Sequence, residues 1–276
     1  MPVLAAFALA MGLAIGSFLN VVIHRVPAGL SVVSPPSACP GCGHAISARD
    51  NVPILSWLLL RASCRHCSAP IAARYPVVEG LTGVLFVVVS VRFAPPFVAQ
   101  LGTSSTLAAA AALEWIALLV LMAASVALAA IDLDVHRLPD RIVLPTGVVG
   151  AVLLGTADLL RGDGVAAATA AAGAGAAALL FAVLWFVRPG GMGLGDVKLA
   201  AVLGLFLGQL GVGPLVVGVA AGFLLGAAFG VALLLLRRAT RRSGIPFGPW
   251  MLLGAWIGVL AGDPLAHAYL VLCGLA

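Results

Sequence analysis

Two aspartates stand where long apolar segments end or begin. Asp132 closes an apolar run, and Asp196 follows the glycine-rich turn GMGLG ahead of another run, in a chain with only 10 acidic residues. A carboxylate at a membrane boundary is costly, so it usually has a function. Two carboxylates held close together cannot easily both ionise, so one keeps its proton while the other loses it. The pair titrates as a unit and offers the acid and base that an aspartic peptidase needs to activate water.

Helix capping is the simpler explanation for the same residues. An aspartate at the start of a helix is a common cap, and this fits Asp196. The helix dipole disfavours a carboxylate at a helix C-terminus, so capping does not account for Asp132. Both explanations stay open on the aspartates alone.

Four further residues could support the pair. Gly193 and Gly195 allow unusual dihedrals and close approach of a substrate strand. Lys198, the single lysine, either biases the aspartates electrostatically or, as we prefer, anchors the chain at the membrane interface. Glu79 enters the second apolar segment from the same side and could reach the site. The other acids are weaker candidates: Asp134 and Asp140 in the same short turn and at the next helix start, and Glu114, Asp158, Asp163 and Asp263 on the far side.

A second constellation consists of cysteines. Two C-x-x-C pairs separated by 21 residues comprise Cys39, Cys42, Cys64 and Cys67. This spacing is typical of a zinc ribbon, in which four thiolates complete a tetrahedral structural site. Disulfides are the alternative, and a cytoplasmic location disfavours them. His44 and His66 could replace a ligand but are more simply solvated, and Cys273 is expected to pack as a small hydrophobe.

The elements that must position these groups are membrane helices. The chain has 276 residues, of which 62% are hydrophobic and 9% charged, whereas a soluble domain carries roughly 25% charged residues. A bilayer core needs about 20 apolar residues per helix. The predicted fold is therefore all-α and polytopic, with about eight transmembrane helices. They are expected near 3–23, 76–92, 107–131, 142–160, 165–187, 199–211, 214–236 and 247–262, the sixth being short.

We divide the chain into three parts. Residues 1–23 lack a basic n-region and a cleavage site, so they form a retained first helix and not a signal peptide. Residues 24–75 form the polar four-cysteine metal-binding loop, and residues 76–276 form the membrane domain that carries the aspartates. Within it, the Ala/Gly-rich run 165–180 is expected to be a tightly packed span.

Lys and Arg positions predict the orientation. With the N-terminus outside, 13 of the 15 basic residues are cytoplasmic, and only Arg92 and Arg161 lie outside. Both aspartates and the cysteine loop are then cytoplasmic and the aspartates share one depth. The formal charge of +5 reflects topology and also favours contact with anionic lipid. It does not indicate nucleic-acid binding, because the arginines are scattered without an aromatic platform.

Motifs along nearly the whole chain resemble those of the bacterial prepilin peptidases, the type IV leader peptidases of pilus assembly and type II secretion. The resembling segments are GSFLNVVIHRVP at 16–27, CPGCGHAI at 39–46, NVPILSWL at 51–58, CRHCSAPI at 64–71, RYPVVEGLTG at 74–83, IDLDVHRLPD at 131–140, GMGLGDVKLA at 191–200 and IPFGPWMLLGAW at 245–256.

The resemblance implies an aspartic peptidase of the GxGD type in the inner membrane, with Asp132 and Asp196 as its catalytic pair. Such enzymes remove the basic leader from prepilins or pseudopilins at the cytoplasmic face. Members with the cysteine loop also N-methylate the new amino terminus, using S-adenosylmethionine as the methyl donor. A peptidase without the methyltransferase activity is the alternative. Outside the family, the rivals are a proton-coupled transporter, in which membrane acids relay protons, and a non-catalytic assembly scaffold.

Overall fold

The structure, a computed structural model, describes residues 1–188, 192–237 and 246–275. Over these ranges it is helical and contains no strand, apart from two isolated bridges in the cysteine loop. The long helices are α1 (Pro2–Arg25), α3 (Arg74–Phe93), α5 (Ser105–Val135), α6 (Asp140–Arg161), α7 (Gly164–Val187), α8 (Leu194–Leu210), α9 (Val212–Leu235) and α10 (Gly248–Leu272). The short ones are η1 (Ala48–Asp50), α2 (Leu55–Leu59) and α4 (Pro95–Gln100).

The all-α prediction is confirmed, and each of the eight predicted spans corresponds to one long helix. Seven helices in the described ranges are long and apolar enough to cross a membrane. The eighth, α8, has 17 residues and corresponds to the predicted short sixth span. It begins at Leu194 and not near residue 199, so Asp196 lies inside its first turn. The protein is a multi-pass membrane protein.

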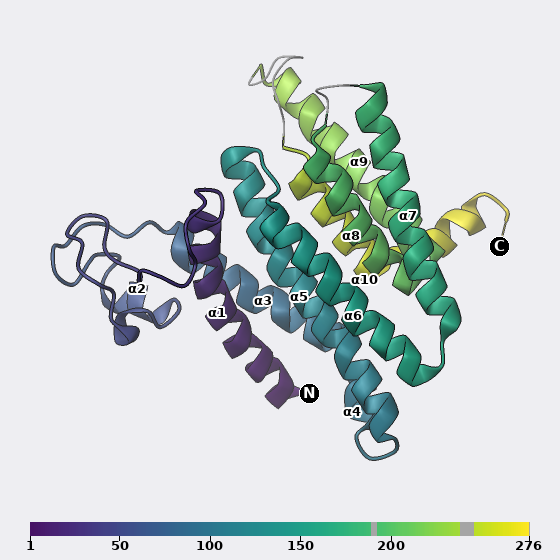
Figure 1. Cartoon of the computed structure of the whole chain (residues 1–276), viewed down its shortest axis with the longest axis horizontal. Helices are drawn as coiled ribbons and strands as arrows, with labels where there is room; N and C mark the ends of the chain where they lie inside the picture. Colours follow the sequence, from purple (N-terminus) through teal and green to yellow (C-terminus); the bar gives the residue numbers. More distant parts are fainter. Residues whose placement is uncertain (189–191, 238–245, 276) are drawn as a thin grey trace.

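Helix α5 lies at the centre of the molecule. In the most apolar stretch of α5, 67% of the residues are buried, against 11% in that of α9. The burial arises because α5 packs on α3, α6 and α10. Figure 1 shows α1, α3 and the cysteine loop on one side, and α7 to α10 on the other. A helix enclosed in this way can hold a polar group in a fixed position away from lipid.

Small residues set the spacing of the helix pairs. A Cβ atom on Gly173 of α7 would lie 2.5 Å from the carbonyl oxygen of Gly204 on α8. Cβ atoms on Gly254 and Gly258 of α10 would come similarly close to backbone atoms of α9. Small residues let membrane helices approach and pack tightly, so the Ala/Gly-rich run forms the packed span expected of it. Because α8 is held against α7, the position of Asp196 is fixed by the bundle.

Two of the acids expected on the far side, Glu114 and Asp158, lie toward the ends of α5 and α6 that are remote from Asp132. Glu114 pairs with Arg161 at 2.6 Å. Asp158 accepts a hydrogen bond of 2.7 Å from the side chain of Gln209. These interactions tie α5, α6 and α8 together at the end remote from the two aspartates.

Candidate active site and metal centre

Asp132 lies in the last turn of α5 and is 4% exposed. Its Oδ2 atom accepts a hydrogen bond of 3.0 Å from the backbone N–H of Gly248, the first residue of α10. The first N–H groups of a helix have no partner within the helix and carry its partial positive charge. The carboxylate of Asp132 therefore caps a neighbouring helix.

Asp196 is the third residue of α8 and is 9% exposed. Its Oδ2 atom accepts a hydrogen bond of 2.9 Å from the backbone N–H of Gly193, the residue that precedes the helix. This carboxylate caps its own helix, as the simpler explanation expected. Our argument that capping could not account for Asp132 was wrong. It considered only the helix that ends at Asp132, whereas the carboxylate of Asp132 caps α10.

Both carboxylates line one open cleft of about 990 Å³. The cleft lies where α5 ends and where α6, α8 and α10 begin. Its lining comprises Val26, Pro27, Asp132, His136, Arg137, Leu138, Pro139, Asp140, Arg141, Met192, Gly193, Gly195, Asp196, Pro246 and Phe247. The structure thus brings the two sequence-predicted aspartates together, each with one oxygen held by a backbone N–H group.

The glycines beside Asp196 also line this cleft. A Cβ atom on Gly195 would lie 3.1 Å from the Cβ atom of Leu138, so the absence of a side chain lets α8 approach the loop that follows α5. Gly193 supplies the N–H group that holds Asp196. Gly191, which precedes them in sequence, lies outside the described residues.

Lys198 and Glu79 have partners other than Asp132 and Asp196. The Lys198 ammonium group contacts the Asp140 carboxylate at 2.7 Å, with both side chains partly exposed. Glu79 is buried, and its Oε2 atom accepts a hydrogen bond of 2.7 Å from the backbone N–H of Ile54. Lys198 therefore joins α8 to α6, and Glu79 ties the cysteine loop to α3.

Gly248 is a contact of Asp132 that our sequence analysis missed. A Cβ atom at this position would lie 2.7 Å from Oδ2 of Asp132 and 3.0 Å from Cδ2 of Leu138. A side chain at this position would displace the carboxylate that the N–H group of α10 holds.

The family resemblance implies that Asp132 takes part in peptide cleavage, and on that expectation Gly248→Ala should lower kcat for cleavage by about 100-fold, since displacing a reacting group by roughly 1 Å has that effect. KM should change little, because the added methyl group pushes on Asp132 and not on a substrate. Gly155→Ala on α6 is the matched control, because a Cβ atom there meets nothing within 4 Å. A Gly248→Ala variant with the kcat of the unaltered protein would contradict this positioning role.

The four cysteines converge as their spacing predicted. Their sulfur atoms all lie within 4.8 Å of one another, and the Sγ atoms of Cys39 and Cys67 are 3.7 Å apart. Zn–S bonds of about 2.3 Å in a tetrahedron place the sulfurs about 3.8 Å apart. The cluster fits a tetrahedral zinc ion with no ligand position left for water.

Each cysteine pair forms the same kind of turn. Cys39 and Cys64 both begin a turn that closes with backbone hydrogen bonds across it, and the following residues adopt positive φ at Gly43 (70°) and Ser68 (59°). The rings of His44 and His66 have centroids 3.6 Å apart and planes tilted by 35°, and neither residue belongs to the cluster.

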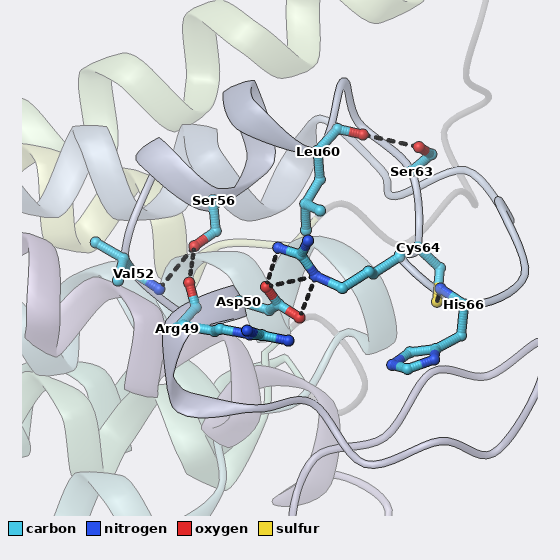
Figure 2. A network of polar contacts seen from close by, with 9 residues as sticks. Arg49, Asp50, Val52, Ser56, Leu60, Ser63, Cys64 and His66 are labelled. Atoms are coloured by element: carbon cyan, nitrogen blue, oxygen red, sulfur yellow. Dashed lines mark hydrogen bonds and ion pairs between the residues drawn. The ribbon is translucent and has the colours of Figure 1, made fainter.

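The second turn is held to the rest of the loop by an ion pair. The Arg65 guanidinium group donates to the Asp50 carboxylate at 2.6 Å and holds the pKa of that carboxyl below its usual range. Figure 2 shows the Asp50 carboxylate with these contacts as dashed lines, in the same region as Ser56 and Cys64. The loop is thus ordered by polar contacts around the sulfur cluster.

The thiols favour a bound cation. Hydrogen bonds from the backbone N–H groups of Cys42 and Gly41 lower the pKa of Cys39 to about 6. For Cys67, a backbone hydrogen bond involving Ala69 lowers the pKa, but the neighbouring Cys42 thiol and burial outweigh it and raise the pKa to about 12. The Cys39 thiol therefore loses its proton more readily than the Cys67 thiol. A bound divalent cation favours the thiolate form of its cysteine ligands.

Comparison with known proteins finds two family models in the chain. The model of the bacterial peptidase A24 N-terminal domain matches residues 10–93, which include α1, the cysteine loop and α3. The model of the type IV leader peptidase family matches residues 119–236, which include both aspartates. The chain is 39% identical to a prepilin leader peptidase/N-methyltransferase of Aeromonas hydrophila, over 94% of this chain and 91% of the relative. The chain belongs to the type IV leader peptidase family.

Other leader peptidases of this family give similar values. Relatives of the same name from Burkholderia pseudomallei (strain 1026b) and Pseudomonas aeruginosa are 36% and 34% identical, over 98% and 96% of this chain and 88% and 92% of the relative. No solved structure matches the chain.

Proposed function

We propose that this leader peptidase is an aspartic endopeptidase that removes the basic leader from type IV prepilins or type II secretion pseudopilins, and that Asp132 and Asp196 are its catalytic pair. The observation that carries the proposal is that two buried aspartates on different helices line one cleft at the same end of the bundle. Membership of the leader peptidase family supplies the class of substrate.

The geometry suits activation of water. One carboxylate of the pair takes a proton from water as its oxygen attacks the scissile carbonyl carbon, while the protonated partner donates a hydrogen bond to the carbonyl oxygen. The proton then passes to the leaving nitrogen as the peptide bond breaks. The N–H groups of Gly248 and Gly193 hold the two carboxyl groups in place. Zinc, held by the four cysteines, would stabilise the loop and take no part in hydrolysis.

We further propose that the protein resides in the inner membrane, with its N-terminus outside and the cleft facing the cytoplasm. Arg92 and Arg161 lie at helix ends remote from the cleft, whereas Arg25, Arg74 and Arg137 lie at the cleft end. An excess of basic residues marks the cytoplasmic side. A prepilin whose apolar helix lies in the bilayer would then present its leader junction to the cleft.

The second proposed activity is methyl transfer from S-adenosylmethionine to the newly formed amino terminus. The methyl group leaves the sulfonium sulfur and bonds to nitrogen, which releases a proton and S-adenosylhomocysteine. The presence of the cysteine loop and the names of the relatives support this activity. The alternative is a peptidase that leaves the product unmethylated.

One assay tests both activities. Purified protein is mixed with a prepilin, with and without S-adenosylmethionine, and the product is followed by mass spectrometry. We expect loss of the leader in both samples and a gain of one methyl mass only with the methyl donor. Cleaved product that never gains this mass would exclude the methyltransferase activity while leaving the peptidase assignment intact. Proton flux in proteoliposomes that depends on Asp132, without cleavage, would favour a transporter instead.

A further inference from the structure

Unlike an ordinary surface helix, the short helix α2 exposes its apolar side chains and buries a polar one. Leu55, Leu58 and Leu59 occupy positions i, i+3 and i+4 on one face and are 52%, 57% and 73% exposed. Ser56, between them in sequence, is 7% exposed. Residues three and four apart share a helix face, so the leucines form one continuous apolar surface that points away from the loop. We call these three residues the leucine face.

Polar contacts fix this orientation. The Ser56 hydroxyl group accepts from the backbone N–H of Val52 and donates to the carbonyl oxygen of Arg49, both at 3.0 Å (Figure 2). The indole N–H of Trp57 donates to the carbonyl oxygen of Ile71 at 3.1 Å. Turning the leucine face inward would break these bonds and leave buried polar groups without partners, which is costly.

The start of α2 lies against a membrane-spanning helix. The hydrogen bond between Ile54 and Glu79 places the start of α2 against α3, within the first two turns of that membrane-spanning helix. On α3 itself, Val77, Leu81 and Val84 are exposed, as side chains facing acyl chains are in a membrane protein. Exposed apolar side chains are therefore present both on α2 and on the part of α3 against which α2 begins.

Charges near α2 fit the same surroundings. Arg49 and Arg61 stand on either side of the helix in sequence and are exposed. Among the described residues, neither is in an ion pair. Basic residues beside an apolar face are typical of segments that lie at the surface of an anionic bilayer.

We propose that α2 lies in the headgroup region of the membrane, with its leucine face at the acyl boundary, and thereby anchors the cysteine loop to the bilayer at the cleft end of the bundle. The occupant of the leucine face is lipid. The inference is independent of the proposed peptidase activity, because α2 contributes no residue to the lining of the cleft.

Photo-crosslinking of the full chain tests the proposal. The photoreactive residue p-benzoylphenylalanine replaces Leu59 in protein reconstituted into nanodiscs of phosphatidylethanolamine and phosphatidylglycerol. Val84→p-benzoylphenylalanine on α3 is the positive control, and Ser68→p-benzoylphenylalanine, exposed on a cysteine turn, is the negative one. After irradiation, intact-mass spectrometry measures adducts of lipid mass.

We expect lipid adducts at Leu59 with a yield comparable to that at Val84 and at least several-fold above that at Ser68. Neutral phosphatidylcholine nanodiscs should lower the yield at Leu59 and leave that at Val84 unchanged, because only α2 depends on basic residues. A yield at Leu59 no higher than at Ser68 would overturn the proposal. With prepilin added, adducts of Leu59 to the prepilin instead of lipid would overturn it too, since the leucine face would then bind a protein partner.

Discussion

Asp132→Asn is expected to lower the rate of leader cleavage by at least about 10³-fold, since a positioned acid or base contributes about 10² to 10⁴ and the pair acts as a unit. Asparagine has nearly the same shape as aspartate and keeps an oxygen that accepts the N–H group of Gly248. The cap of α10 therefore survives, and the loss falls on proton transfer. Initial rates with a purified prepilin, measured by mass spectrometry, give the size of the effect.

Asp196→Asn is expected to have the same effect for the same reason, because an asparagine oxygen still accepts from Gly193. The double variant should be no slower than either single variant, since the effects of groups that act together are far from additive. Multiplied losses would show that the two aspartates act independently and would contradict a shared catalytic water.

Asp134→Asn is the matched control for these variants. Asp134 lies two residues from Asp132 on the same helix, but it is exposed and pairs with Arg74 at 2.5 Å. An exposed ion pair contributes only about 0.2–1 kcal/mol, so its loss should change the cleavage rate by less than about five-fold. Cleavage at the unaltered rate by the folded Asp132→Asn protein would contradict the assignment of Asp132 to the catalytic pair.

The sequence predicts the helices and the metal ligands of the site better than the contacts between residues that are far apart in the chain. Apolar runs located every long helix because a bilayer requires long apolar segments, and C-x-x-C spacing located the metal centre because its ligands are close in sequence. The partner of Asp132 is 116 residues away, and no local pattern encodes such a contact. Gly248 had only the signal of a glycine before Pro249 at a helix start, which marks a helix N-terminus but not the carboxylate that it meets.

The same distinction explains Glu79. A carboxylate at the start of a membrane helix is a reasonable candidate for catalysis from sequence. The structure instead places it under the cysteine loop, as the acceptor for Ile54. Which acids share a cleft depends on the azimuth of each helix in the bundle, and that follows from close contacts such as Gly173 against Gly204.

The second large effect concerns the metal centre. Removing one cysteine turn with Cys64→Ser and Cys67→Ser together is expected to abolish metal binding and unfold the loop. Zinc binding supplies about 10–16 kcal/mol of folding free energy in small four-ligand sites, and this loop has little else to stabilise it. Of its side chains, Cys39 and Ser56 are buried, whereas most others are exposed.

Metal analysis and limited proteolysis measure this effect. The unaltered protein should hold one zinc ion per chain and resist trypsin at Arg61 and Arg65. The double variant should hold none and be cut there, while the membrane helices keep their helical circular dichroism signal. Cys273→Ser is the matched control, because Cys273 is exposed and outside the cluster. A double variant that keeps its zinc and resists trypsin would contradict the four-cysteine site. A chelator should make the loop of the unaltered protein sensitive to trypsin, and added zinc should restore its resistance. This result would show that the metal, and not a disulfide, holds the two turns together.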